Sequence, residues 1–86
     1  MKETILIIED DAGLLELLSE KVQECGYNTV CMLSAESASD WLNKNTPYLI
    51  VLDYNLPDMN GQDFIAELKT KDKYVPPFLM STGQGD

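Results

Sequence analysis

The residues of this chain best suited to chemistry are carboxylates that follow two aliphatic runs. Asp53 comes directly after residues 49–52, and three acids at 9–11 come directly after residues 4–8. Because the carboxyl ends of parallel strands meet at one edge of a sheet, we expect these acids to converge on one pocket. Neighbouring acids repel one another, and a bound cation relieves that repulsion. The sequence therefore predicts an acidic cluster that binds a cation.

A magnesium-dependent phosphoacceptor site is the chemistry that this cluster favours. Mg²⁺ prefers oxygen ligands, keeps several waters, and usually takes one or two carboxylates together with a phosphate. Asp10 and Asp53 could supply the carboxylates, and Glu9 could hold a coordinated water. An aspartate can also act as a nucleophile and form an acyl phosphate. Phosphoryl transfer then needs little beyond positioning and the neutralisation of charge.

Two other interpretations of the acids explain less. A calcium loop of the EF-hand type could begin at Asp53, but Pro57 stands at its fifth position and Asp58 replaces the glycine required at its sixth. A carboxylate that closes a buried strand must be paired, hydrated or metal-bound to stay charged, so Asp53 is not explained as a surface acid. Helix caps and solvated loop positions do account for most other acids, including Asp11, Asp58, Asp63 and Asp72.

Hydrophobic periodicity predicts four strands that alternate with three helices. The strands are expected at residues 4–8, 28–32, 48–53 and 78–82. The helices are expected at residues 12–25, 35–42 and 62–70. This alternation demands right-handed crossovers and a parallel sheet, so the predicted fold class is α/β.

Each helix is expected to present one apolar face to the sheet. Asp11 and Ser34 are the predicted N-caps of the first two helices, and Gly26 is predicted to end the first one. The predicted inner faces are Leu14, Leu17, Leu18, Val22 and Cys25 in the first helix, Ala35, Ala38, Trp41 and Leu42 in the second, and Phe64, Ile65 and Leu68 in the third.

Composition excludes several function classes. The chain has 15 acidic residues, six lysines, no arginine and a net charge of −9, so it lacks a basic face for nucleic acid or an anionic membrane. It has no histidine, which excludes Ser-His-Asp and Cys-His catalysis within the chain. Cys25 and Cys31 match no metal or redox spacing and are predicted to be reduced core thiols. We expect no membrane span, no signal peptide and a cytoplasmic location.

The order of these motifs resembles the receiver (response-regulator) domains of two-component signalling. The resemblance rests on residues 5–11, 49–61 and 77–83, and it covers the whole chain. Its most specific part is the run Asp-x-x-Leu-Pro-x-Met-x-Gly that begins at Asp53. The resemblance implies a flavodoxin-like (CheY-like) doubly wound parallel sheet with strand order 2-1-3-4. It also implies a signalling module rather than an enzyme.

The resemblance implies a role for each site residue. Asp53 would accept a phosphoryl group from a sensor histidine kinase. Asp10 would bind Mg²⁺ directly beside Asp53, Glu9 would bind it through a water, and Asn55 would bind it through its backbone carbonyl. The hydroxyl of Thr82 would contact a phosphoryl oxygen and report whether the site is occupied.

Receiver domains normally continue beyond a fourth strand through a helix, a fifth strand that carries a lysine, and a last helix. We therefore expect residues 1–86 to be a receiver domain whose C-terminal portion is missing. Within it, Pro57 and Gly61 are implied to shape the loop after Asp53. The fourth strand would then be an exposed edge through residues 78–80, which favours a homodimer or domain swapping.

Two alternative functions stay open. One is a receiver-like module that binds a metal or a protein without being phosphorylated. The other is a haloacid-dehalogenase-like phosphatase, whose nucleophilic aspartate also follows an aliphatic strand. Its motif needs a second aspartate two residues later and then Thr or Val, whereas this chain has Asn55 and Pro57. Turnover of a phosphate ester would indicate the phosphatase, and a stable adduct on Asp53 would indicate the receiver.

Overall fold

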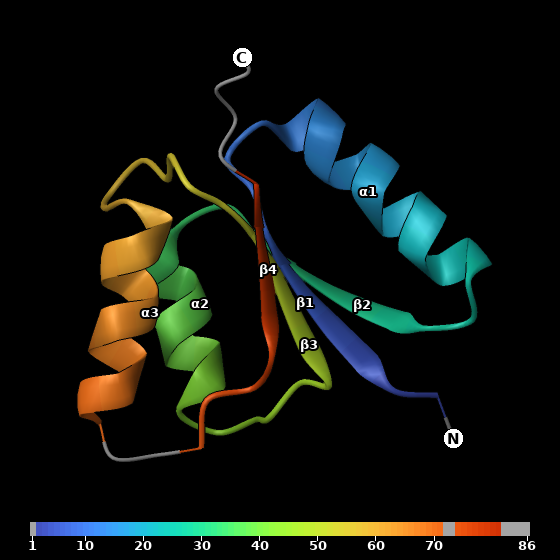
Figure 1. Cartoon of the computed structure of the whole chain (residues 1–86). Coiled ribbons are helices and arrows are strands. Elements are labelled where there is room, and N and C mark those ends of the chain that lie inside the picture. The colour runs from blue at the N-terminus through green and yellow to red at the C-terminus, as the bar shows by residue number, and fades with distance from the viewer. Residues whose placement is uncertain (1, 72–73, 82–86) are drawn as a thin grey trace.

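The fold is a parallel sheet with helical connections. The computed structural model describes residues 2–71 and 74–81. The strands are β1 (Thr4–Ile8), β2 (Asn28–Met32), β3 (Leu49–Asp53) and β4 (Phe78–Ser81), and the helices are α1 (Ala12–Glu24), α2 (Ala35–Leu42) and α3 (Gly61–Thr70). The strands pair in parallel in the order β2-β1-β3-β4 (Figure 1). The predicted α/β class, element order and strand order are confirmed.

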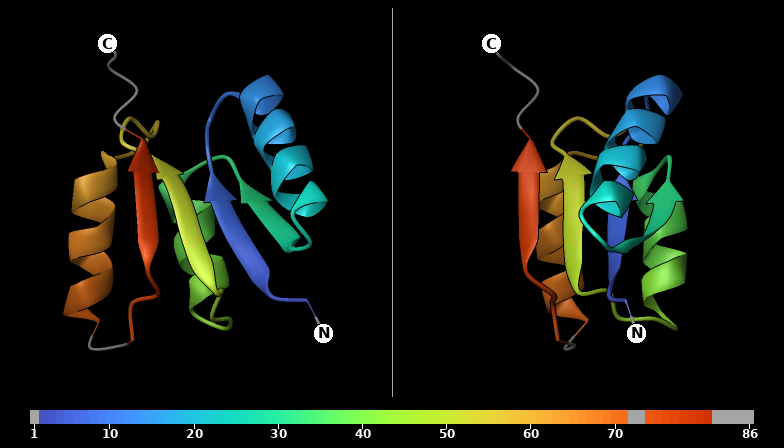
Figure 2. Two further views of the ribbon diagram at one scale, coloured as in Figure 1. Left: turned by 45° about the vertical axis from the view of Figure 1, so that its right-hand side comes forward. Right: turned by 90° about the vertical axis from the view of Figure 1, so that its right-hand side faces the viewer.

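The sheet lies between two helical layers of unequal size. Helices α2 and α3 cover one face, and α1 lies on the other face over β1 and β2 (Figure 1). Figure 2 shows that β4 stands at the edge of the sheet, away from α1. In the described part of the chain, no helix is both long and apolar enough to cross a membrane.

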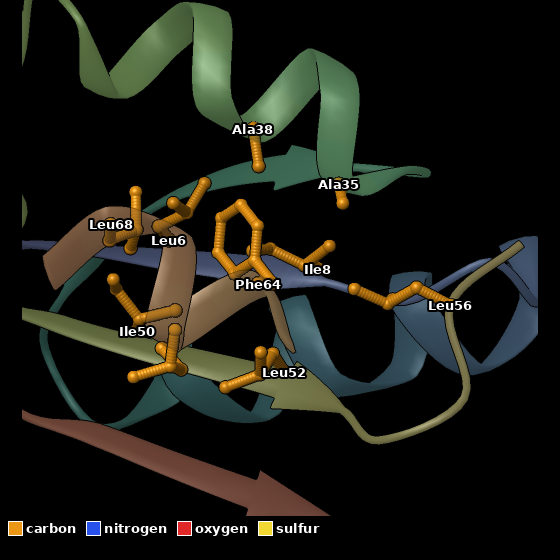
Figure 3. Close-up of a cluster of buried hydrophobic side chains, with 10 residues drawn as sticks. Leu6, Ile8, Ala35, Ala38, Ile50, Leu52, Leu56, Phe64 and Leu68 are labelled. Carbon is orange, nitrogen blue, oxygen red and sulfur yellow. The ribbon is translucent and has the colours of Figure 1, made fainter. Parts of the chain in front are cut away.

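The larger core lies between the sheet and the α2–α3 layer. Phe64 of α3 is fully buried at its centre, between side chains of β1, β3 and α2 (Figure 3). Alternate residues of β1 and β3 point into this core, as the pleat of a strand requires. The buried members are Leu6, Ile8, Ala35, Ala38, Ile50, Leu52, Leu56, Phe64, Ile65 and Leu68. The predicted inner faces of α2 and α3 are confirmed.

The smaller core, under α1, corrects the predicted inner face of that helix. Leu14 and Leu17 are 42% and 50% exposed, so the prediction that they face inward was wrong. The helix instead packs through Leu15, Leu18 and Val22, and a 2.7 Å hydrogen bond between the hydroxyls of Ser19 and Thr29 joins the same side of α1 to β2. The buried members of this core are Ile5, Ile7 and Leu15, with Leu18, Val22, Tyr27, Leu49 and Val51 packed against them.

Both cysteines also differ from their prediction. Cys25 and Cys31 are free thiols, but both are exposed, so they are not core residues. Cys25 is the C-cap of α1, beyond the part of the helix that packs on the sheet. Cys31 lies on β2, which is an edge strand of the sheet.

The predicted caps of α1 and α2 are confirmed. A carboxylate oxygen of Asp11 accepts a hydrogen bond from the Leu14 amide at 3.1 Å. The hydroxyl of Ser34 accepts one from the Ser37 amide at 3.2 Å. Gly26 follows α1 with φ of +99°, a conformation that glycine adopts without steric cost and that ends the helix.

Strand β4 forms one edge of the described sheet and pairs with β3 alone. It was predicted to extend to Thr82, which lies outside the described residues. Phe78 and Leu79 are 38% and 61% exposed, which agrees with the expectation of a weakly protected edge. The self-association expected from this edge stays a prediction.

Candidate functional site

Three acidic side chains meet at the carboxyl edge of the sheet. Glu9 and Asp10 follow β1, and Asp53 ends β3. Because β1 and β3 are neighbours and parallel, the residues at their carboxyl ends lie side by side. One oxygen of each of the three carboxylates lies within 4.8 Å of the other two. The predicted convergence is therefore present, although Asp11 caps α1 instead of joining it.

Glu9 is the buried member of this cluster. Its side chain is 6% exposed, and its backbone N–H continues the sheet by donating to the Met32 carbonyl at 3.0 Å. Its carboxylate accepts one hydrogen bond, from the Asp11 amide at 3.1 Å. Burial raises the pKa of the Glu9 carboxyl, the Asp11 amide opposes that change, and the charges of Asp53 and Asp10 add to it. A cation beside Glu9 would relieve this unfavourable environment.

Asp53 is half-buried at the end of β3. Its Oδ1 accepts a hydrogen bond from the Asn55 amide at 3.2 Å, which orients the carboxylate. Asp53 pairs with Ser81 of β4, and the Tyr54 amide donates to the Ser81 carbonyl at 2.7 Å. The Asn55 carbonyl as a metal ligand stays a prediction. The predicted phosphoryl contact, Thr82, lies outside the described residues.

The loop from β3 to α3 is closed tightly at its base. Asn55 and Asn60 form an isolated antiparallel bridge, and the Gly61 amide donates to the Tyr54 carbonyl at 2.6 Å. A Cβ at Gly61 would lie 2.9 Å from the Asp53 carbonyl oxygen and 3.2 Å from the Tyr54 Cα. Backbone this close leaves room for glycine only. Gly61 therefore lets α3 begin directly against Asp53, which agrees with the role in shaping this loop that the family resemblance implied for it.

Asp58, in the same loop, has partners that the sequence did not reveal. Its Oδ1 accepts a hydrogen bond from the Ala35 amide at 3.0 Å, and its Oδ2 accepts one from the Glu36 amide at 2.8 Å. These amides, chiefly that of Ala35, lower the pKa of the Asp58 carboxyl. Asp58 was predicted to be a helix cap or a solvated acid. It does cap a helix, but that helix is α2, more than 20 residues earlier in the chain.

The donor set at the sheet edge favours a hard divalent cation. Its described side-chain ligands are three carboxylates, which suit Mg²⁺ or Ca²⁺ better than softer metals. Three negative charges at this spacing repel one another, so bound cationic charge is favourable. A cation bound there would lie beside the Asp53 carboxylate, an arrangement that suits a nucleophile attacking a phosphoryl group.

Comparisons of the sequence and of the structure with known proteins point to the same family. The family model described as "Response regulator receiver domain" matches residues 5–86. The transcriptional regulatory protein CssR of Bacillus subtilis is 35% identical over 86 residues, which cover all of this chain and 38% of CssR. The chain thus spans well under half the length of that relative.

Solved structures agree with the family match. The non-phosphorylated HemR receiver domain from Leptospira biflexa is 34% identical with a TM-score of 0.79, over 98% of this chain and 68% of that one. The response regulator protein TrrA from Thermotoga maritima, solved in complex with Mg²⁺-BeF, is 31% identical with a TM-score of 0.75. That match covers 83% of this chain and 61% of TrrA.

Proposed function

Since this chain belongs to the response regulator receiver domain family, we propose that it accepts a phosphoryl group on Asp53 from the phosphohistidine of a partner histidine kinase. A receiver domain of two-component systems is a signalling module rather than a classical enzyme. The proposed cofactor is Mg²⁺. The observation that carries the proposal is the approach of the Glu9, Asp10 and Asp53 carboxylate oxygens to within 4.8 Å of one another.

The proposed reaction takes place at the Asp53 carboxylate. One of its oxygens attacks the phosphorus of the donor, a P–O bond forms, and the P–N bond to the donor imidazole breaks with its electron pair remaining on nitrogen. The products are an acyl phosphate on Asp53 and a neutral imidazole, provided that the second ring nitrogen of the donor carries a proton, so that the leaving group departs as imidazole and not as imidazolate. Because Oδ1 is occupied by the Asn55 amide at 3.2 Å, Oδ2 is the oxygen that we expect to attack.

The proposed metal ligands are Asp10, Asp53 and the Asn55 backbone carbonyl, with Glu9 bound through a water. When bound, Mg²⁺ supplies positive charge that offsets the charge on the phosphoryl oxygens. The surroundings of Glu9 support a cation in this position, because its carboxylate is buried and lies beside the carboxylates of Asp10 and Asp53. The Mg²⁺-BeF complex of the relative TrrA supports magnesium as the ion.

Phosphorylation would act as a switch. Thr82 is proposed to contact a phosphoryl oxygen, and the pairing of its neighbour Ser81 with Asp53 supports this role. Occupancy would then bias a two-state arrangement of the surrounding loops and change the surface that partners meet. We place this function in the cytoplasm, with a histidine kinase as donor and no nucleic-acid or membrane partner for this domain.

The domain boundaries are also part of the proposal. We treat residues 1–86 as a receiver domain whose C-terminal portion lies outside this sequence. The match to the HemR receiver domain, of which this chain spans 68%, supports that extent. The exposed edge strand β4 supports a homodimer or a domain swap of this chain.

The proposal is tested by intact-mass analysis after incubation with acetyl phosphate and Mg²⁺. The wild-type chain should gain the mass of one phosphoryl group, and Asp53→Asn should gain none. Asp40→Asn, which removes the same charge from the exposed side of α2, should behave as the wild type. A folded wild-type chain without an adduct would contradict the proposal and favour a module that binds without being phosphorylated. Steady hydrolysis of a phosphate ester would favour the phosphatase.

A further inference from the structure

Asp58 completes the N-terminus of a helix to which it does not belong. The N-cap of α2, Ser34, satisfies the Ser37 amide at 3.2 Å. The amides of Ala35 and Glu36 come earlier in the same first turn, where an α-helix offers no carbonyl partner. Both donate to the Asp58 carboxylate, at 3.0 Å and 2.8 Å. Asp58 thus supplies two acceptors that the sequence of α2 lacks.

This contact fastens the tip of the loop that carries the proposed site. The base of the loop is closed by the bridge between Asn55 and Asn60, so residues 56–59 form the part that projects from it. The projecting part is held by an apolar contact and a polar one. Leu56, 8% exposed, packs in the core cluster that also contains Ala35, and Asp58 binds the first turn of α2.

We infer that Asp58 is a positioning residue: by fastening the β3–α3 loop to the first turn of α2, its carboxylate keeps Asn55 and Asp53 in the arrangement that binds the metal. The inference rests on the proposed function. The physical link is the Asn55 backbone, whose N–H donates to Asp53 at 3.2 Å and whose carbonyl is a proposed ligand. A loop released from α2 would spread Asn55 over more conformations, and binding would have to select among them.

Asp58 is not one of the acids that converge at the sheet edge. Both of its oxygens accept hydrogen bonds from α2, and the acids that converge at the sheet edge are Glu9, Asp10 and Asp53. Its influence on the metal must therefore pass through the loop, apart from the long-range effect of its charge. Those two contributions can be separated by variants.

The test is a Mg²⁺ titration of the isotope-labelled chain followed by NMR, with three variants. Asp58→Asn keeps one acceptor oxygen but loses the charge and the second acceptor. Asp63→Asn removes the same charge from an exposed position in the first turn of α3. Ser34→Ala weakens the N-terminus of α2 but leaves the loop attached. We expect Asp58→Asn to weaken Mg²⁺ binding about 5- to 10-fold and both controls to change it less than about twofold.

The inference fails if Asp58→Asn binds Mg²⁺ as the wild type does. It also fails if Ser34→Ala weakens binding equally, because fraying of α2 would then be the cause, or if Asp63→Asn does so, because charge alone would then be the cause. Absence of Mg²⁺ binding by the wild-type chain would instead contradict the proposed function.

A second readout, taken without metal, is independent of that proposal. The Asn55 amide resonance should shift and broaden in Asp58→Asn and stay unchanged in Ser34→Ala, because only the first variant releases the loop. An unchanged Asn55 resonance in Asp58→Asn would overturn the inference even if the chain binds no metal.

Discussion

The β3–α3 loop connects two carboxylate environments that differ in their hydrogen-bond donors. At its start lies Asp53, beside Glu9 of the β1–α1 connection; each of the two accepts one described backbone hydrogen bond and lies close to other carboxylates. Near its tip, Asp58 accepts two backbone amides at the N-terminus of a helix. The pKa of Glu9 is raised and that of Asp58 is lowered, and these opposite directions follow from the surroundings.

The two carboxylate environments have opposite effects on the stability of the fold. The charge on Asp58 is stabilising, because helix amides and the helix dipole favour a negative group at that position. The charge of Glu9 in the acidic cluster is destabilising in the absence of a cation, because burial disfavours it and the charges of Asp53 and Asp10 repel it. Destabilising clusters of acids are typical of functional sites. A cation that binds the folded state would raise its stability and so offset the repulsion between the acids.

Removing a charge from the cluster should have the largest effect and should change binding and stability in opposite directions. Asp10→Asn deletes a proposed ligand, so Mg²⁺ affinity should fall by at least about 10-fold. Without metal, the same variant should be more stable than the wild type, because it removes repulsion from Glu9 and Asp53. Calorimetric Mg²⁺ titration and urea unfolding measure the two quantities. If Asp10→Asn is less stable than the wild type without metal, repulsion between the acids does not destabilise the fold.

A methyl group at Gly61, at the base of the β3–α3 loop, should displace the backbone of Asp53. In Gly61→Ala the new Cβ would meet the Asp53 carbonyl at 2.9 Å, so backbone must move and the chain should lose about 1–3 kcal/mol of stability. Gly13→Ala is the matched control, since its Cβ would meet only the Asp11 carboxylate at 3.5 Å inside α1. That variant should gain about 0.5–1 kcal/mol by urea unfolding, because alanine favours a helix. Equal stability of the two variants would contradict the close packing at Gly61.

Removing the charge of Asp58, near the tip of the loop, should lower the free energy of unfolding by less than Gly61→Ala does. Asp58→Asn takes a good acceptor from two helix amides and should cost about 0.5–1 kcal/mol, at the low end for a cap because the side chain is exposed. Urea unfolding without metal measures this cost. The sign should be opposite to that of Asp10→Asn, and a gain in stability would remove the distinction between the two environments.

The pH dependence of stability should differ between Glu9 and Asp58. We expect this effect to be the smallest of the four, but its direction is specific to each carboxyl group. Since the pKa of Glu9 is raised by folding, its contribution is fully present below the ordinary carboxyl pKa and is lost as pH rises through the raised value. Since the pKa of Asp58 is lowered, its contribution is present above the ordinary pKa and is lost as pH falls through the lowered value.

Metal-free variants make this visible. Glu9→Gln should be more stable than the wild type at neutral pH, and the difference should shrink on acidification. Asp58→Asn should be less stable at neutral pH, and its difference should also shrink, but at lower pH. Urea unfolding from neutral pH to about pH 3 measures both curves. Two curves that change at the same pH would indicate that the environments are alike.

The strands and helix caps that position this site could be predicted from the sequence, because each depends on residues close together in the chain. Aliphatic runs define β1 and β3, and parallel order brings the residues after them together, so the approach of Asp10 to Asp53 follows from the sequence pattern alone. The caps Asp11 and Ser34 were equally readable, since a cap acts within its own helix. Asn60 has the same chemistry before α3 and could have been found in the same way.

The failures required tertiary information. Adjacent leucines in α1 form two possible apolar stripes, and periodicity alone cannot decide which one meets the sheet. In the structure the stripe with Leu15 packs on the sheet, accompanied by the Ser19–Thr29 hydrogen bond, and Leu14 is exposed. Asp58 reaches amides more than 20 residues away, so no local pattern could indicate its role.

The most direct test of this account is to locate the phosphoryl group by peptide mass mapping after incubation with acetyl phosphate, with Mg²⁺ in one sample and a chelator in the other. We expect one adduct, on the peptide that contains Asp53, formed with Mg²⁺ and largely absent with the chelator. An adduct on another acid, or equal labelling in both samples, would contradict the claim that the acidic cluster binds the cation that prepares Asp53 for phosphorylation.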